Sequence, residues 1–506
     1  MKKNLSIFLL FWSFINVNGA KILGIYPVGC KSHFIFNEAI VKSLISAGHE
    51  VTVASPFPHP NPPKNYTVID MSQDSFIYVG RSTLEEFNER STYSLIEFIT
   101  SIEEEYCNKF MNLKEIKDLF NSKEKQYDII ILEIFKMYKC FLPLAQKFNI
   151  PVIGTASQRS WSIADQSIGN PNNPSFIPAE YGASSWKHDS FYERLLNIWK
   201  TSIVYFVQSY TIPLKLRKFH QRYAEELSFY DENSVTPSLL FYNTHFSFFP
   251  RPMNPNVIEI AGIHINDAKP LPEHIEKFIE ESANGVVLFS LGSMIRGSSL
   301  SYETQLAFKQ AFAEIPQRVI WKYEEEMQNI PNNVLTSPWI PQRDLLAHPN
   351  VRVFISHCGQ SGIYEAIHTA TPIITVPVYG DQGSTAAVLQ NLGVAVPLDL
   401  LTVTKQSILH ALNSIINDTK YSENMRRLSE SFKDRPMTPQ QSVVYWTEYV
   451  IKHNGARHLQ NPSTHLSWFQ YLLLDVTLFV IFTFSIVIYL FYCTLEICHF
   501  YFTNKK

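Results

Sequence analysis

The residues best suited to chemistry stand in a short turn near position 357. An apolar stretch, Val351–Ser356, predicts a strand, and a helical pattern begins a few residues later. Small or polar side chains fill the turn and the start of the helix: His357, Gly359, Ser361 and Gly362. Small residues let a phosphate approach the backbone, and the amides at a helix N-terminus attract its charge. The turn therefore predicts a pyrophosphate site.

Two further side chains could contact the rest of a nucleotide. Glu365 lies one to two turns into the helix, where its carboxylate could accept hydrogen bonds from ribose hydroxyls. Trp339 could stack on a flat base such as uracil. Taken alone, Trp339 would be a core residue and Glu365 part of a solvated helix face. Their joint spacing favours the nucleotide interpretation.

A histidine in the first part of the chain is a candidate base. His33 ends the loop between a predicted strand at 21–26 and a helical pattern at 34–47. At a helix N-terminus the neutral imidazole is favoured, and a neutral histidine can accept a proton. The alternative for a single loop histidine is a structural or merely exposed role.

Three motifs in the second half of the chain carry a resemblance to a known family. They are WIPQRDLLAHP at 339–349, FISHCGQSGIYEA at 354–366 and PVYGDQ at 377–382. Together they resemble the donor-binding signature of the UDP-glycosyltransferases, which include the UDP-glucuronosyltransferases. The resemblance covers almost the whole chain, including FSLGS at 289–293 and WFQY at 468–471. It implies inverting transfer of a hexose, from UDP-glucose or UDP-glucuronate, to a hydroxyl of a small lipophilic acceptor, as in detoxification or conjugation.

The resemblance also assigns the donor site residue by residue. It places the diphosphate at His357, Gly359 and Ser361, the ribose at Glu365, and the uracil at Trp339 and Gln342. Gly292 and Ser293, after a predicted strand, correspond to a second set of nucleotide contacts. Asp381 and Gln382 correspond to the pair that holds the sugar hydroxyls; the alternative for Asp381 is a helix N-cap, and both roles could coexist.

By the same resemblance, His33 removes the proton of the acceptor hydroxyl as its oxygen attacks the anomeric carbon and UDP leaves. The family commonly places an aspartate beside this histidine, at the end of the strand predicted here at 127–132. This chain has Glu133 there, and we expect it to orient His33, the alternative being a solvated glutamate paired with Lys136. Cys358 is a second departure, because it replaces the usual glycine. These departures leave a second function open: a catalytically silent relative that binds lipophilic ligands or partner subunits at a membrane.

The elements that must position these residues alternate between strand and helix. Strands are expected at 21–26, 51–54, 127–132 and 151–154, and again at 286–290, 318–322, 351–356, 372–376 and 394–397. Such alternation predicts an α/β fold with two open parallel sheets. The expected architecture is therefore the GT-B type, with two Rossmann-like lobes facing across a cleft. Residues 158–185 have the composition of a long loop. Residues 190–229 alternate aromatic and basic side chains at helical spacing, which fits either packed surface helices or contact with membrane or acceptor.

The expected organisation has six parts. They are a signal peptide at 1–19, an acceptor-binding lobe at 20–250, a linker at 251–284, a donor-binding lobe at 285–460, a transmembrane helix at 474–495 and a cytosolic tail at 496–506. This layout predicts a single-pass type I protein of the endoplasmic reticulum membrane with its catalytic part in the lumen. Asn65 and Asn417 begin sequons and are candidate glycosylation sites.

Composition narrows the partners. The net charge of -3 and the absence of a basic run argue against nucleic acid. No Asp-x-Asp motif occurs, so no metal is expected, and the UDP-sugar is a co-substrate rather than a cofactor. A homo-oligomer stays open. Of the six cysteines, four precede the membrane segment; disulfides among them are possible, but buried free thiols are the expectation.

Overall fold

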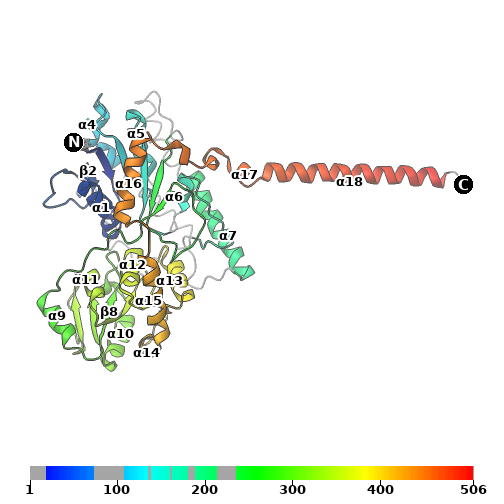
Figure 1. The fold of residues 1–506 in the computed structure, drawn as a ribbon. Helices are drawn as coiled ribbons and strands as arrows, with labels where there is room; N and C mark the ends of the chain where they lie inside the picture. The colour runs from blue at the N-terminus through cyan, green and yellow to red at the C-terminus, as the bar shows by residue number, and fades with distance from the viewer. Residues whose placement is uncertain are drawn as a thin grey trace, which may run out of the picture.

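The protein consists of two α/β lobes and a long C-terminal helix, shown by a computed structural model. The structure describes residues 19–72, 107–134, 138–159, 162–179, 189–211, 214 and 235–504. Figure 1 shows the first lobe above the second, with the C-terminal helix leaving from the side of the first.

The first lobe is built on a seven-stranded sheet in the order β3-β2-β1-β4-β5-β6-β7, and all its strand pairs are parallel. The strands are β1 Lys21–Ile25, β2 Glu50–Ser55, β3 Tyr66–Asp70, β4 Ile129–Glu133, β5 Val152–Ala156, β6 Leu239–Tyr242 and β7 Val257–Glu259. The helices are α1 Lys31–Ser46, α4 Lys114–Asn121, η1 Tyr138–Phe141, α5 Leu142–Phe148, α6 Ser162–Ser167, α7 Phe191–Phe206 and the π-helical turn η2 Val207–Thr211.

The second lobe is built on a six-stranded parallel sheet in the order β10-β9-β8-β11-β12-β13. Its strands are β8 Val286–Ser290, β9 Arg318–Lys322, β10 Val334–Ser337, β11 Val351–Ser356, β12 Ile373–Thr375 and β13 Ala395–Pro397. Its helices are α9 Glu273–Glu280, η3 Gly297–Ser299, α10 Tyr302–Glu314, α11 Gln342–Ala347, α12 Gln360–Thr369, α13 Gln382–Asn391, α14 Lys405–Asn417 and α15 Thr419–Lys433.

The predicted pair of doubly wound lobes is confirmed, because continuous apolar runs became buried parallel strands. Every residue of β4, β5 and β8 is buried, as expected for strands covered by helices on both faces. Four strands were not predicted: β3, β6, β7 and β10. Their apolar runs carry little periodic signal of their own. The loop predicted at 158–185 contains the short helix α6. The segment predicted as a linker, 251–284, contains β7 of the first sheet and the helix α9.

The last helix of the globular part returns from the second lobe to the first. α16, Pro439–Lys452, packs against α1. Its Val443 and Val450 are fully buried in the same apolar cluster as Ile40 and Leu44 of α1. Figure 1 shows α16 lying beside the first sheet, although α15 before it covers the second lobe. The core of the first lobe therefore includes residues from near the end of the chain.

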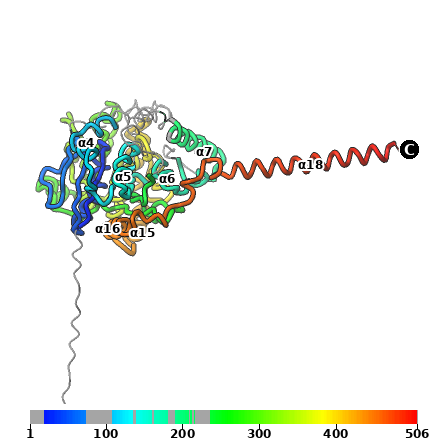
Figure 2. The backbone as a smooth tube through the Cα atoms, turned by 90° about the horizontal axis from the view of Figure 1, so that it is seen from above, coloured from blue at the N-terminus to red at the C-terminus, as the bar shows by residue number. Residues whose placement is uncertain are grey.

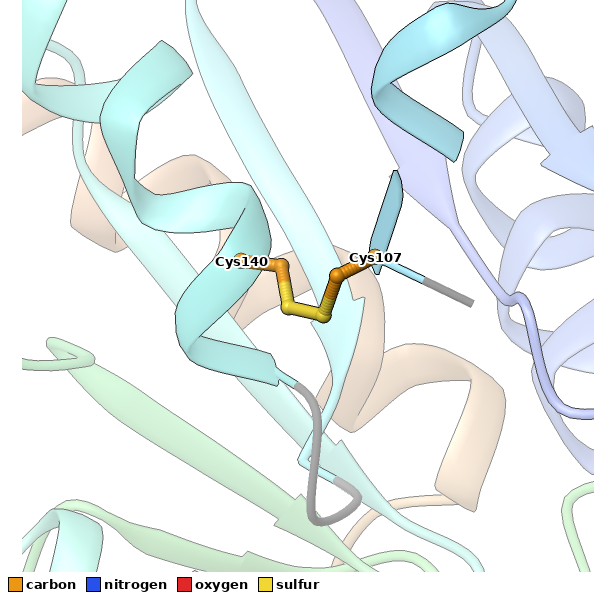
Figure 3. The surroundings of a disulfide bond; sticks show 2 residues. All are labelled: Cys107 and Cys140. Atoms are coloured by element: carbon orange, nitrogen blue, oxygen red, sulfur yellow. A yellow bond between two sulfur atoms is a disulfide. The ribbon is translucent and has the colours of Figure 1, made fainter. Parts of the chain in front are cut away.

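A disulfide joins Cys107 to Cys140, whose Cα atoms are 5.8 Å apart. Figure 3 shows the bond between the segment that begins at Cys107 and the helical turn η1. The expectation of free thiols is wrong for this pair. It holds for Cys30 and Cys358, which are buried and unbonded. Spacing could not show the pairing, because the two residues meet only once β4 and its following turn are folded.

The C-terminal segment leaves the globular part as a single helix. It follows η4 Arg457–Leu459, η5 Pro462–His465 and α17 Trp468–Tyr471. α18, Leu474–Thr503, has 30 residues, is long and apolar enough to cross a membrane, and has no part of its apolar window buried in the protein. Figure 2 shows it extending away from the lobes. The predicted span of 474–495 falls within this helix, which continues past Glu496 to Thr503. The predicted signal segment lies almost wholly outside the described residues, and Lys505 and Lys506 lie outside them.

Candidate active site

A cavity of about 370 Å³ lies between the two lobes at the carboxyl ends of both sheets. In open parallel sheets, ligands bind at this edge where the strand order reverses. The reversal falls between β1 and β4 in the first sheet and between β8 and β11 in the second. The cavity is lined by all the predicted donor, sugar and base residues: His33, Gly292, Ser293, Trp339, Gln342, His357, Gly359, Ser361, Glu365, Asp381 and Gln382. The topology therefore brings residues that are far apart in the sequence together on one surface.

His33 and Glu133 are in direct contact at the first-lobe side of the cavity. His33 Nδ1 lies 2.6 Å from Glu133 Oε1. His33 is the third residue of α1, which begins at Lys31 rather than at the predicted residue 34. Glu133 is the last residue of β4 and is only 2% exposed. Lys136, its alternative partner, lies outside the described residues. The contact itself is the geometry expected of an orienting carboxylate.

A shell of hydrogen bonds fixes the Glu133 carboxylate. Ser157 Oγ donates to Glu133 Oε1 at 2.8 Å, and Asn37 Nδ2 donates to Oε2 at 3.2 Å. Asn37 is in turn held by Thr155 Oγ1, which donates to its Oδ1 at 2.7 Å. Both carboxylate oxygens are thus occupied in a buried setting, which fixes the orientation of the group that faces His33.

The electrostatic setting of His33 favours the protonated ring more than the sequence suggested. Burial lowers the pKa of His33, but the charge of Glu133, its hydrogen bond and the charge of Asp381 together raise that pKa above its usual value. The expectation of a neutral ring rested on the helix N-terminus alone. The nearby carboxylates outweigh the effect of burial, so the ring is a stronger base than an unpartnered histidine.

On the second-lobe side, the N-terminus of α12 faces the cavity, as predicted for a pyrophosphate site. Gly359 is the N-cap residue, and the ring of His357 occupies the space that a side chain at position 359 would need. A Cβ added to Gly359 would lie 2.4 Å from His357 Nε2, and one added to Gly292 would lie 2.5 Å from His357 Cε1. Gly292 also has φ +78°, which favours glycine. Two glycines therefore make room for the histidine beside the helix N-terminus, and burial lowers the pKa of His357 to about 4.

Cys358, the second departure from the family pattern, does not intrude on this site. Its side chain is fully buried in the second-lobe core and does not line the cavity. Its backbone has φ +67°, a conformation that glycine adopts more easily. The substitution therefore affects the backbone conformation of the turn rather than the space for a phosphate.

Glu365 lies beside α11, where Gln342 Nε2 donates to its Oε2 at 2.7 Å. The resemblance assigned Gln342 to the uracil; the structure adds that its side-chain amide also contacts the carboxylate of Glu365. His264 Nε2 lies 3.6 Å from Glu365 Oε1 and lines the same cavity. Burial raises the pKa of Glu365 to about 7, although the bond from Gln342 and the charge of Arg343 lower it. Trp339 lines the mouth of the cavity and is 62% exposed, which suits a stacking platform more than a core residue.

Asp381 and Gln382 stand at the N-terminus of α13. Asp381 is the N-cap residue, but its side chain makes no capping hydrogen bond. The side-chain oxygen Oε1 of Gln382 accepts hydrogen bonds from the backbone N–H groups of Val378 and Tyr379 at 2.8 and 3.1 Å. The side-chain NH₂ of Gln382 is therefore the group that can contact a ligand. Burial raises the pKa of Asp381, and the charge of Arg159 opposes this.

Arg159 crosses from the first lobe to the second beneath the site. It is fully buried, with Nη2 donating to Ser384 Oγ at 2.7 Å and Nε donating to Thr385 Oγ1 at 3.1 Å. Its guanidinium stacks on Phe249, with 4.2 Å between the guanidinium carbon and the ring centroid. A first-lobe cation thus holds the helix that carries Asp381 and Gln382.

Sequence reasoning missed Asn37, Ser157, Arg159 and His264. A signal existed for Ser157, because it follows β5 at the same sheet edge as Glu133. No local signal marked the others, since their partners lie on distant elements. The sequon residues Asn65 and Asn417 are exposed and lie away from the cavity. Within the described part of the chain, no group of three or more His, Cys, Asp or Glu side chains could hold a metal ion.

Comparisons with known proteins agree with this geometry. The family model described as "UDP-glucoronosyl and UDP-glucosyl transferase" matches residues 20–506. UDP-glucosyltransferase 2 of Dactylopius coccus is 37% identical over 495 residues, covering 97% of this chain and 95% of the relative. UDP-glucuronosyltransferase 2B15 of Homo sapiens is 32% identical over 490 residues, covering 91% and 90%. A solved UDP-glucosyltransferase from Polygonum tinctorium shares the GT-B fold, with TM-score 0.57, 14% identity, and coverage of 86% of this chain and 99% of that one.

Proposed function

Because this chain belongs to the UDP-glycosyltransferase family, we propose that it transfers a hexose from UDP-glucose or UDP-glucuronate to a hydroxyl of a small lipophilic acceptor, with inversion at the anomeric carbon. The observation that carries the proposal is the His33–Glu133 pair, 2.6 Å apart, on the cavity that the α12 N-terminus also faces. A base and a leaving-group site thus share one cleft.

In the proposed reaction, the first lobe binds the acceptor and the second binds the donor. His33, oriented through Nδ1 by Glu133, takes the acceptor hydroxyl proton at Nε2. The acceptor oxygen forms a bond to the anomeric carbon as the bond to the UDP oxygen breaks. The α12 amides stabilise the negative charge that develops on the diphosphate. Asp381 and the Gln382 amide bind sugar hydroxyls, and Trp339 stacks on the uracil.

The decisive test is release of UDP by the purified full chain from UDP-glucose or UDP-glucuronate with a panel of phenols. We expect acceptor-dependent release with one donor, and that same donor should protect the protein against thermal unfolding. Donor protection without release for any acceptor would overturn the enzymatic proposal in favour of a binding protein. No protection by either donor would overturn the donor site itself.

Donor affinity is expected to rise with pH up to about pH 7, the pKa of the buried Glu365 carboxyl, and to level off above it. Ribose hydroxyls bind the ionised carboxylate, which lowers its pKa, so binding releases a proton and weakens as pH falls. Calorimetry with an intact UDP-sugar measures this. The variant Glu365→Gln should bind more weakly above the transition and show a flatter profile. An unchanged profile in this variant would remove Glu365 from the ribose site.

We further propose that α18 anchors the chain in the endoplasmic reticulum membrane as a type I protein with both lobes in the lumen. In sealed microsomal vesicles, the lobes should resist added protease, and endoglycosidase should shift the mass of the protein through Asn65 or Asn417. Single replacement of each asparagine by glutamine identifies the modified site. Digestion of both lobes in intact vesicles would overturn this orientation.

A further inference from the structure

The helix α7 on the first lobe turns an apolar face outward. Phe191, Trp199 and Phe206 are 73%, 66% and 57% exposed, and Tyr192, Leu195 and Ile198 are exposed beside them. Apart from the hydroxyl groups of Tyr192 and Tyr205, Ser202 is the one polar side chain among the exposed residues of this helix. A water-soluble surface helix has the opposite arrangement, with charged residues outside and apolar residues inside.

The buried face of α7 fixes this orientation. Asn197 is 3% exposed, and its Nδ2 donates to the carbonyl oxygens of Pro174 and Ile177 at 2.7 and 2.8 Å. Its Oδ1 accepts from the backbone N–H of Ala179 at 2.6 Å. Val204 is buried in the apolar core of the first lobe. Three hydrogen bonds and a core contact therefore hold the opposite side of the helix against the protein, so the apolar face cannot simply rotate inward.

The position of α7 indicates what covers this face. Figures 1 and 2 both place α7 at the side of the first lobe from which α17 and α18 leave, and Figure 1 shows it oblique to α18. On the same side, α17 exposes three aromatic side chains, those of Trp468, Phe469 and Tyr471. Aromatic side chains collect where a membrane meets water, because their rings suit the headgroup region. Apolar patches of this extent are rare on proteins that contact only water.

We infer that α7 lies in the headgroup region of the bilayer that α18 crosses, as a second, monotopic membrane contact that holds the acceptor lobe on the lipid surface. The inference rests on the proposed anchor. The occupant is lipid rather than a second copy of the chain, because α7 lies on the side of the lobe from which the membrane helix leaves, where α17 also exposes aromatic side chains. An amphipathic helix with an aromatic face binds in this way, parallel to the interface.

A nitroxide reporter on the full chain tests this contact. Cys493 and Cys498 are first replaced by serine, leaving the buried Cys30 and Cys358 and the disulfide. Single reporter sites are then introduced as Ser202→Cys on α7, Ile486→Cys in α18 and Tyr302→Cys on α10, the last being 70% exposed on the second lobe. Ser202 is chosen because its replacement removes no apolar side chain. Each labelled protein is reconstituted in phosphatidylcholine vesicles, and thermal protection by the donor checks that it is folded.

The measurement is the ratio of collisions with oxygen, which concentrates in lipid, to collisions with a water-soluble nickel chelate. We expect a raised ratio at Ser202, as at Ile486, and a low ratio at Tyr302. Adding Leu195→Glu and Trp199→Glu should lower the ratio at Ser202 to the value at Tyr302 and leave Ile486 unchanged. These two outcomes together support the lipid contact.

Three results would overturn it. A low ratio at Ser202 with a high one at Ile486 rejects the α7 contact and keeps the anchor. Low ratios at both sites reject the anchor, and the α7 contact with it. Poor access of both reagents to Ser202 shows that protein covers the face, either a second copy or another segment of this chain.

Discussion

Replacing His33 by alanine is expected to abolish sugar transfer while donor affinity stays nearly unchanged. In the proposed reaction the imidazole is the base that takes the acceptor proton, and it belongs to the first lobe, whereas the proposed donor contacts belong to the second. A positioned general base contributes typically 10² to 10⁴-fold, so we expect kcat/KM to fall by roughly that factor. Acceptor-dependent UDP release measures the rate, and calorimetry with the donor measures the affinity.

His274→Ala is the matched control, because His274 is exposed on α9 and lies away from the cavity. It should keep both transfer and donor binding. If His33→Ala lost donor affinity as strongly as rate, His33 would be a donor ligand or a structural residue, and the assigned role would be wrong.

Replacing Glu133 by glutamine is expected to lower turnover nearly as much while donor affinity is spared. The carboxylate contacts His33 Nδ1, and in the proposed reaction it stabilises the imidazolium that forms when the acceptor loses its proton. In a comparable histidine–carboxylate pair, the amide variant lowers kcat by about 10⁴-fold, because the wrong tautomer is favoured. Glu133→Asp keeps the charge and should recover part of the activity. Steady-state rates of the two variants, compared at saturating donor, give the answer.

The pH profile separates this role from a purely structural one. His33 must be neutral to act as a base, so the rate falls as the pH drops through the pKa of His33. The charge of Glu133 raises that pKa, so Glu133→Gln should lower it and move the acid limb of kcat/KM to lower pH. A fully active glutamine variant with an unmoved acid limb would show that Glu133 only fills space at the strand end.

The geometry of the proposed donor half of the site could be predicted from sequence because its parts are local. The strand, the turn with His357 and Gly359, and the helix that begins at Gln360 are contiguous, so their spacing alone indicates the anion site. The contact of His33 with Glu133 was also predictable in outline, because His33 follows one strand and Glu133 ends the neighbouring parallel strand. Parallel strands bring their carboxyl ends to one edge whatever their separation in sequence.

The rest depends on contacts that no local pattern records. Asn37 meets Glu133 across 96 residues, and Arg159 meets Ser384 across 225, so only the folded chain brings them together. The pairing of Cys107 with Cys140 is a similar case. The composition of 190–229 indicated helices but not their orientation, because Asn197 in α7 reverses the usual rule and places the polar contact inside.

The return of α16 to the first lobe has a consequence for how the chain is made. Ribosomes deliver the N-terminal part first, and domains generally fold as they emerge. Here the core that covers α1 includes Val443, Val450 and Ala456. The first lobe therefore lacks part of its apolar core until nearly the whole globular part has been synthesised. A chain cut short before α16 keeps all seven strands of the first sheet but exposes the apolar side of α1. Truncated products of a premature stop codon are therefore expected to be retained by chaperones and degraded, rather than to persist as a separate first lobe.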